Sequence, residues 1–385
     1  MLKRDIFNSD HDLLREQVGH FLDAEVVPHH RAWAEAGHVP ADIWRRAGAN
    51  GLLCRMVPEE YGGRGRGFLD SVVIIEELAR RRISGLLTCL QSDIVAPFLV
   101  RLGTGEQKRR YLPGFCSGEV LGAIALTEPR SGSDIHHMQT RCLRNGDELV
   151  LSGEKIHISN GSLADLVIVA ARSDRGAIGG QAGISLALVE APCAGLFRER
   201  IPKSGVPALD TARLCFDDCR LPADRLLGAE GMGFLYLMTF LSIERLILAI
   251  YAQASAVVVL RDLIADCGAR PASAGTVLDY QNTQFQLGDL FSQCAVNQAF
   301  IDRCIAEQAM GRSNPRSACI AKLRATETLK KLAMAGVQLR GAMGISGASG
   351  ARATQDVIDS CVQSIWGGTS EVLLGVIGRS LINSL

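Results

Sequence analysis

The run Leu166-Val167-Ile168-Val169-Ala170 lies in the middle of the chain and consists of β-branched and small apolar residues. Similar short runs, some of them alternating apolar with polar residues, occupy positions 148–152 and 184–189. Runs of this length between turn residues are typical of β-strands. We therefore predict a small β domain, a barrel or a sandwich, over residues 120–228. The Gly-rich segment 173–183 is expected to be a surface loop.

Helical spacing flanks this β domain on both sides. From Asp10 to about Glu119 apolar residues recur every three or four positions, with breaks at proline and paired glycine, which predicts a helical domain over residues 1–119. After Gly233 the spacing returns, which predicts a four-helix bundle over residues 229–385 and an α+β fold for the whole chain. The long segments of the bundle are expected near 233–266, 279–311, 315–341 and 369–384.

Charge and cysteine usage narrow the class of protein. The 385 residues carry 41 basic and 41 acidic side chains, so the net charge gives no reason to expect a nucleic-acid partner. The 12 cysteines show no CxxC pair and no metal-ligand spacing, which predicts reduced thiols and no metal site. No secretory signal is visible over residues 1–17, so a cytoplasmic location is expected. The apolar stretch 234–260 has Glu244 and Arg245 at its middle, which argues against a membrane span.

Two polar loops follow strand-like runs and could approach a ligand. The first is Leu126-Thr127-Glu128-Pro129-Arg130-Ser131-Gly132-Ser133-Asp134, in which hydroxyls surround a glycine that lets a ligand come close to the backbone. The second is Lys155-Ile156-His157-Ile158-Ser159-Asn160-Gly161. Each loop alone would also suit an ordinary strand end.

Together and in this order, within a helix–β–helix chain, the two loops resemble the flavin-binding loops of acyl-CoA dehydrogenases. The resemblance covers essentially the whole sequence and extends to Glu244-Arg245 and Gly367-Gly368-Thr369-Ser370-Glu371. It implies FAD as the cofactor. It also implies a homo-oligomer, a dimer or tetramer, and an electron-transfer flavoprotein as electron acceptor.

The resemblance also assigns residues to the cofactor. It places Leu126 and Thr127 beside the flavin ring, Gly132 and Ser133 near the diphosphate, and Ser159 near the N5 edge, with His157 covering one flavin face. Thr369 and Glu371 would contact the same cofactor. Four further positions match residues that reach the FAD of a neighbouring subunit in the family's tetramers, and these are Arg270, Gln281, Gln338 and Gly341.

The base that removes the α-proton of the thioester is the central question, because that step needs a carboxylate in a dry site. Many family members carry this glutamate directly before a Gly-Thr pair near the C-terminus, but here that position is Gly367. A second branch, similar to the long-chain and isovaleryl enzymes, carries it in a Glu-Arg pair on a helix, which points to Glu244. A glutamate that merely pairs with Arg245 is the structural alternative.

The resemblance thus implies α,β-dehydrogenation of an acyl thioester in lipid metabolism. Glu244 would take the α-proton while the β-hydride passes to flavin N5. The Gly367 N–H and a ribityl hydroxyl would bind the thioester carbonyl, and Ser133 and Arg245 are expected to face the substrate. Whether CoA or a carrier protein holds the acyl group is left open.

Several positions depart from the family pattern. His157 stands where a large aromatic residue is usual, and Ser273 and Ala274 replace a Phe-Gly pair. Ala342 replaces a second glycine, and Ile358 stands before Asp359 where arginine is common. These departures favour a specialised thioester, such as one bound to a carrier protein, and leave two rival functions open. One rival is a flavin oxidase or monooxygenase on the same fold, and the other is a non-catalytic thioester-binding protein.

Overall fold

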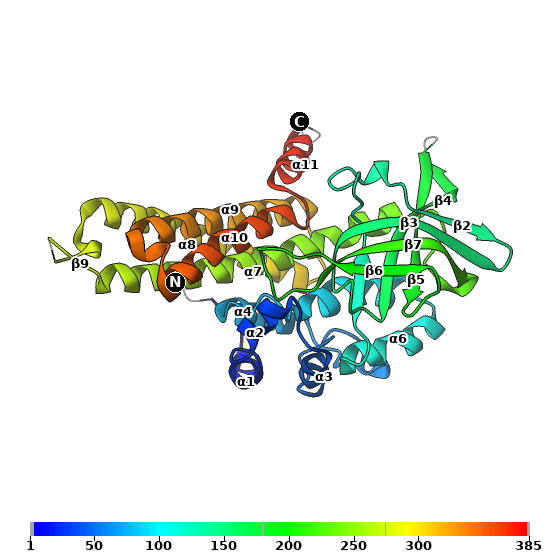
Figure 1. Cartoon of the computed structure of the whole chain (residues 1–385), viewed down its shortest axis with the longest axis horizontal. Coiled ribbons are helices and arrows are strands. Elements are labelled where there is room, and N and C mark those ends of the chain that lie inside the picture. The colour runs from blue at the N-terminus through cyan, green and yellow to red at the C-terminus, as the bar shows by residue number, and fades with distance from the viewer. Residues whose placement is uncertain (1–3, 179–180, 274, 383–385) are drawn as a thin grey trace.

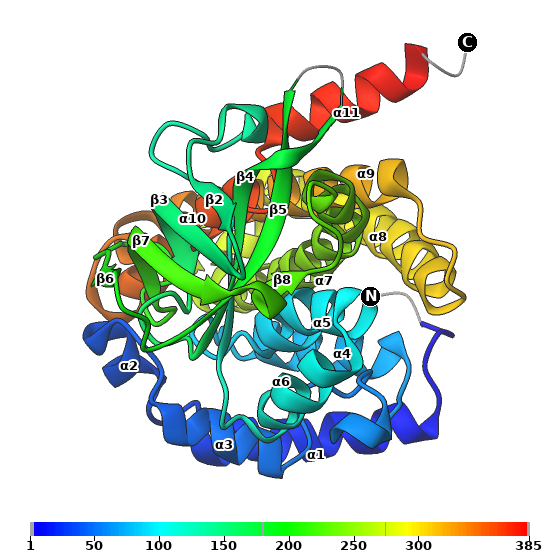
Figure 2. The ribbon, with the colours of Figure 1, turned by 90° about the vertical axis from the view of Figure 1, so that its right-hand side faces the viewer.

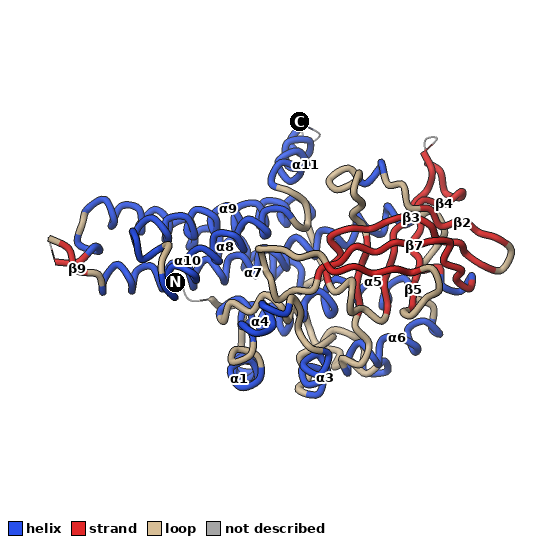
Figure 3. Tube along the Cα trace, viewed as in Figure 1, coloured by secondary structure: helices blue, strands red, loops and turns tan. Residues whose placement is uncertain are grey.

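The computed structural model describes residues 4–178, 181–273 and 275–382. Helices form the first third of the chain, strands the middle, and long helices the last part (Figure 3). The expected order of helices, β-strands and helices is confirmed.

Six α-helices, one π-helix and the 3-10 helix η1 (Glu59–Tyr61) make up the described N-terminal part. Two of the helices begin with reciprocal side-chain caps, at Asn8 and Thr104, which satisfy backbone N–H groups of the first turn. The π-helix η2 matters most for the site, because it leads into α5 beside the start of β1. The elements are α1 (Ser9–Glu25), α2 (His30–Ala36), α3 (Ala41–Ala49), α4 (Phe68–Arg80), η2 (Leu90–Val95), α5 (Ala96–Leu102) and α6 (Gly105–Ser117).

The middle part is one eight-stranded sheet with the order β6-β7-β3-β2-β4-β5-β8, and β1 pairs in parallel with β4. Its bounds are β1 (Gly122–Ala125), β2 (Arg141–Asn145), β3 (Glu148–Ser159), β4 (Leu166–Ile178), β5 (Gln181–Glu190), β6 (Leu196–Arg200), β7 (Thr211–Pro222) and β8 (Leu226–Leu227). The prediction of a surface loop over residues 173–183 is wrong for the described residues. The antiparallel pairing of β4 and β5 continues past Ser173, and the glycine-rich composition hid this hairpin. Residues 179–180 lie outside the described part.

The C-terminal part is a bundle of α7 (Gly233–Ala269), α8 (Gln281–Ala309), α9 (Pro315–Arg340) and α10 (Gly347–Ile365), followed by α11 (Ser370–Ile382) (Figure 1). The sequence reading missed α10, because its first turn is made of Gly, Ala and Ser, which signal a loop. α7 is long and apolar enough to cross a membrane, but 67% of its most apolar window is buried inside the protein, as in a core helix.

Two ends of the molecule can be distinguished along its longest axis. The β sheet lies at one end, and the short strand β9 (Pro271–Ala272), which follows α7, lies at the other (Figure 1). α11 leaves the bundle and stands beside the loop that follows β1, as both ribbon views show (Figure 2). The chain therefore presents one surface between sheet, bundle and α11, and a second at the far end of the bundle.

Candidate active site

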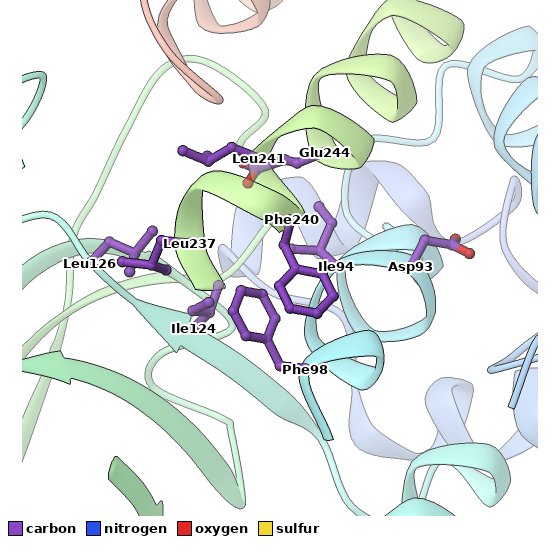
Figure 4. A pocket seen from close by; sticks show the side chains of 9 residues that line it. All are labelled: Asp93, Ile94, Phe98, Ile124, Leu126, Leu237, Phe240, Leu241 and Glu244. Carbon is purple, nitrogen blue, oxygen red and sulfur yellow. The ribbon is translucent and has the colours of Figure 1, made fainter. Parts of the chain in front are cut away.

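A narrow cavity lies where α7 passes between η2, α5 and the end of β1. Glu244 from the middle of α7 lines it together with apolar side chains, among them Ile94, Ile124 and Leu126 (Figure 4). The rings of Phe98 and Phe240 stack with centroids 4.1 Å apart. The space open to the centre of a water molecule is about 10 Å³, which suits roughly one water. The carboxylate thus faces a small cavity whose walls are mostly apolar.

The surroundings of Glu244 raise its pKa above the ordinary value. Burial is the main cause, and the positive charges of Arg245 and Lys322 oppose it. A carboxylate with a raised pKa is a better proton acceptor, as a general base requires.

Gly367 lies directly beside this carboxylate. A Cβ atom built on Gly367 would lie 3.6 Å from Glu244 Oε1. Positions 244 and 367 are the two that match the base in different branches of the family that the sequence resembles. They are far apart in the sequence but lie side by side in the structure.

Two cations fix the backbone at Gly367 and Gly368. Arg245 Nε donates to the Gly367 carbonyl at 3.2 Å, and Lys322 Nζ donates to the Gly368 carbonyl at 2.8 Å. Both glycines have φ in the left-handed region, +63° and +101°, which other residues rarely adopt. None of the hydrogen bonds among the described residues uses the Gly367 N–H, so this donor is open to a ligand. Arg245, expected to face the substrate, donates to the loop and to Cys319 Sγ instead; a direct substrate contact stays a prediction.

The two polar loops lie together, as the resemblance required. Ile156 N–H donates to the Thr127 carbonyl at 2.9 Å, and Lys155 Nζ donates to the Leu126 carbonyl at 2.9 Å. Lys155 is fully buried and also pairs with Glu128 at 2.8 Å. Burial lowers the pKa of Lys155 to about 8, which the partner carboxylate opposes. This buried pair joins the loop after β1 to β3.

The predicted cofactor residues in these loops face outward from the sheet. Gly132 and Ser133 are exposed, and the side of Gly132 that a Cβ would occupy is open space. His157 is exposed at an irregularity in the pairing of β3 with β7 and has φ +59°. A bulge of this kind re-aims the side chain of its strand. Ser159 ends β3 and is partly buried.

Thr369 and Glu371 lie at the start of α11. The Thr369 hydroxyl accepts the Val372 N–H at 3.3 Å, and its carbonyl accepts the Leu373 N–H. The backbone N–H of Glu371 and the Thr369 hydroxyl lower the pKa of the exposed Glu371 carboxyl. These residues therefore follow the Gly367-Gly368 loop on the surface between bundle and sheet.

The remaining four predicted cofactor residues lie at the far end of the bundle. Arg270 is exposed just after α7, and its Nη1 donates to the Leu339 carbonyl at 2.9 Å. A Cβ on Gly341 would lie 3.1 Å from the Arg270 guanidinium, so these two residues are neighbours. Gln338 is exposed one residue before Leu339, and the exposed Gln281 begins α8. Ala274 lies outside the described residues.

Two buried charged residues were missed by the sequence reading. Asp93 in η2 borders the cavity with its carboxylate turned away from the stacked rings, and it accepts a 2.5 Å hydrogen bond from Ser71 Oγ (Figure 4). Burial raises its pKa to about 7. Like Glu244, Asp93 lies within an apolar stretch of the sequence, and this could have drawn attention to it. Lys322 could have been found because helical spacing places it on the apolar stripe of α9.

The residues on the surface between sheet, bundle and α11 fit a flavin. An open glycine side, exposed hydroxyls, a re-aimed imidazole and an unused backbone N–H beside a partly buried carboxylate supply room and donors for a flat, polar cofactor. Among the described residues no cluster of His, Cys, Asp and Glu could hold a metal ion.

Comparisons with known proteins agree with this geometry. Models of the N-terminal, middle and C-terminal domains of acyl-CoA dehydrogenases match residues 8–119, 123–219 and 231–382. The mitochondrial long-chain specific acyl-CoA dehydrogenase of Mus musculus is 39% identical over 99% of this chain and 88% of its own length.

Solved structures give the same result. An acyl-CoA dehydrogenase from Geobacillus kaustophilus has a TM-score of 0.94 and 36% identity, covering 98% of this chain and all of its own. A glutaryl-CoA dehydrogenase from Mycobacterium smegmatis in complex with FADH2 has a TM-score of 0.89 and 26% identity, covering 98% of this chain and 95% of its own.

Proposed function

Because the chain belongs to the acyl-CoA dehydrogenase family, and so dehydrogenates an acyl thioester with FAD, we propose that Glu244 is the base that removes the α-proton. The observation that carries the proposal is the 3.6 Å separation between Glu244 Oε1 and a Cβ built on Gly367. A carboxylate on α7 reaches the point at which a glutamate at position 367 would begin. The chain therefore supplies a base although position 367 has no side chain.

In the proposed mechanism the chain binds the thioester, excludes water and moves one proton. The Gly367 N–H donates to the thioester carbonyl and stabilises the negative charge that grows there as the α-proton leaves. The Glu244 carboxylate accepts that proton, and the apolar walls keep the carboxylate poorly solvated and hence basic. The loops around Thr127 and Ser159 and the start of α11 would hold FAD, which would supply the two-electron oxidation of the substrate.

A homo-oligomer completes this proposal. The loops at Leu126 and Ser159 lie at the sheet end, whereas Arg270 and Gly341 lie near β9 at the opposite end (Figure 1). Both groups can serve one cofactor only if they come from different copies of the chain. Exposed apolar side chains on α8, including Phe285 and Val296 at 66% and 69% exposure, support burial of this helix by a second copy.

The carrier and the electron acceptor are further parts of the proposal. The departures from the family pattern at His157, Ser273 and Ala342 support a specialised thioester substrate. Its acyl group would be attached to CoA or to a carrier protein. An electron-transfer flavoprotein is the acceptor that the family implies. Both statements can be tested with one preparation.

The test is an anaerobic titration of the purified, FAD-loaded protein with acyl-CoA and acyl-carrier thioesters of increasing chain length and branching. The expected result is loss of the oxidised-flavin absorbance with at least one thioester, and slow reoxidation of the reduced protein by air. Rapid reoxidation by air would instead assign the chain to the oxidases or monooxygenases. If the protein does not retain FAD supplied in excess, the proposed function is wrong.

A further inference from the structure

Lys322 is a buried cation that forms no ion pair with a carboxylate in the described part of the chain. It is 0% exposed and lies on the buried face of α9, among Ala318, Cys319, Ala325 and Thr326. Its ammonium donates instead to a neutral group, the Gly368 carbonyl, at 2.8 Å. Burying a lysine without a paired carboxylate costs several kcal/mol by usual estimates, so its place beside the catalytic loop calls for a function.

The hydrogen bonds of Lys322 and Arg245 form a clamp from two helices. Arg245 on α7 holds the Gly367 carbonyl, and Lys322 on α9 holds the next carbonyl along the chain. Both glycines have positive φ, which glycine adopts readily, and the two hydrogen bonds hold the carbonyls of this loop from two helices. The position of the Gly367 N–H relative to Glu244 is therefore set by this clamp.

The same two cations act on the charge of the base. Apart from Glu244, the charged and titratable groups that interact with Lys322 are Arg245 on α7, Glu327 and Cys319 on α9, and Glu371 in the first turn of α11. Glu244 itself is influenced by Arg245 and Lys322, and it lies near Cys89, the residue before η2. Within this cluster the positive charges favour the ionised carboxylate, which burial disfavours.

We propose that Lys322 is a positioning residue of the reaction, which anchors the Gly368 carbonyl and, with Arg245, keeps Glu244 ionised while substrate excludes water. The inference rests on the proposed role of Glu244. It assigns to one buried lysine both a geometric and an electrostatic part in α-proton removal. The two parts are separable, because a neutral donor can hold a carbonyl but cannot stabilise a carboxylate.

The test measures proton removal without oxidation. The FAD of the holoenzyme is first reduced chemically, and the protein is mixed in deuterated buffer with the acyl-CoA, from butyryl-CoA to palmitoyl-CoA, that reduces the wild-type cofactor fastest. Deuterium entering the α-position is followed by mass spectrometry between pH 5 and 7, below the value of about 8 to which burial lowers the pKa of Lys322. Lys322→Met and Lys322→Gln are compared with Lys331→Met, which removes an exposed lysine from the same helix.

Loss of the charge should raise the apparent pKa of exchange by about one unit or more, since a nearby opposite charge lowers a carboxyl pKa by about 1–3 units. Exchange at pH values below that pKa should then fall about tenfold or more. Lys322→Gln should show the same shift in the apparent pKa while keeping a hydrogen-bond donor for the Gly368 carbonyl. The test can therefore be made with Lys322→Gln even if Lys322→Met does not fold. Lys322→Arg should return the profile most of the way to wild type, and Lys331→Met should match wild type.

An unshifted profile in either neutral variant would overturn the inference about Lys322. That result would leave the role of Glu244 intact, provided that Glu244→Gln loses exchange in the same assay. Exchange at the wild-type rate in Glu244→Gln would instead overturn the proposed function itself, whatever Lys322 does.

Discussion

The two ends of the bundle hold predicted functional residues in opposite ways. At one end, Glu244 and Arg245 on α7 lie beside Gly367, and Arg245 donates to the Gly367 carbonyl. All three are partly buried, and the fully buried Lys322 donates to the next carbonyl, that of Gly368. At the far end, Arg270, Gln281 and Gln338 are exposed. The Arg270 guanidinium donates to the Leu339 carbonyl and occupies the side of Gly341 where a Cβ would stand.

This difference indicates which parts of the site a single copy of the chain can form by itself. A base needs a fixed surrounding, and the chain provides it from its own helices. In the described part of the far end, Arg270, Gln281 and Gln338 are exposed donors. We infer that one copy of the chain supplies all the protein groups for proton removal. Retention of the cofactor, in contrast, depends on contact between two copies.

The largest effect is expected when the proposed base, Glu244, is removed. Glu244→Gln keeps the shape of the side chain but cannot accept the α-proton, so anaerobic flavin reduction should fall by about 10²–10⁴, the usual worth of a general base. Retained flavin absorbance is the control, because the far end is untouched. Reduction at the wild-type rate would make Glu244 a structural residue.

Moving the base to position 367 sharpens the same test. Adding Gly367→Glu to Glu244→Gln should restore part of the lost rate, because the two positions meet. A Cβ at 367 would lie 2.4 Å from Leu248 Cδ1 on a backbone with φ +63°, so Leu248→Ala is included to make room. Gly367→Glu in the presence of Glu244 should be inhibitory, since two adjacent carboxylates hinder each other's ionisation.

The burial of Asp93 predicts a pH dependence of stability. Burial raises its pKa from 3.8 to about 7, so its favourable contribution is present below pH 4 and is lost as the pH rises through about 7. Asp93→Asn should remove this loss and be more stable than wild type at pH 8, by on the order of 4 kcal/mol at most. Urea unfolding at pH 4 and pH 8 measures the difference. Equal pH dependence in the two proteins would show that water reaches Asp93.

The far end should respond in cofactor retention and not in chemistry. Arg270→Ala removes an exposed donor expected to reach a neighbouring copy's cofactor, so FAD affinity should fall about tenfold, the order of one charge-assisted hydrogen bond. The ratio of flavin to protein absorbance after gel filtration measures it. The rate of reduction per bound flavin should stay within twofold of wild type. An unchanged affinity would remove Arg270 from the cofactor site.

The smallest effect is expected at His157. His157→Phe should keep most activity and bind flavin slightly better, since a larger ring gains stacking area. Fluorescence titration of the cofactor-free protein with FAD compares the two affinities. A fall in turnover by orders of magnitude with flavin still bound would assign the imidazole a chemical role.

The sequence predicted the architecture because periodicity and motif order reflect local structure. The resemblance of the Glu244-Arg245 pair to one branch of the family predicted Glu244 as the base, and this stays a prediction. The sequence reading missed α10 and the β4–β5 hairpin, where glycine and small residues weaken the local signal and pairing across the sheet decides the structure. It could not predict that Lys322 holds the Gly368 carbonyl, because that contact joins residues 46 positions apart and depends on how α9 packs.

The buried pair of Lys155 and Glu128 has a consequence for how such a chain can change over generations. Loss of either partner leaves a charge without its counterpart in the interior, at a cost of roughly 3–5 kcal/mol, so the two are expected to be inherited or replaced together. Exposed neighbours such as His157 carry no such penalty and can vary one at a time. The exposed residues that face the cofactor can therefore change by single substitutions, while the buried Lys155–Glu128 pair behind them is retained.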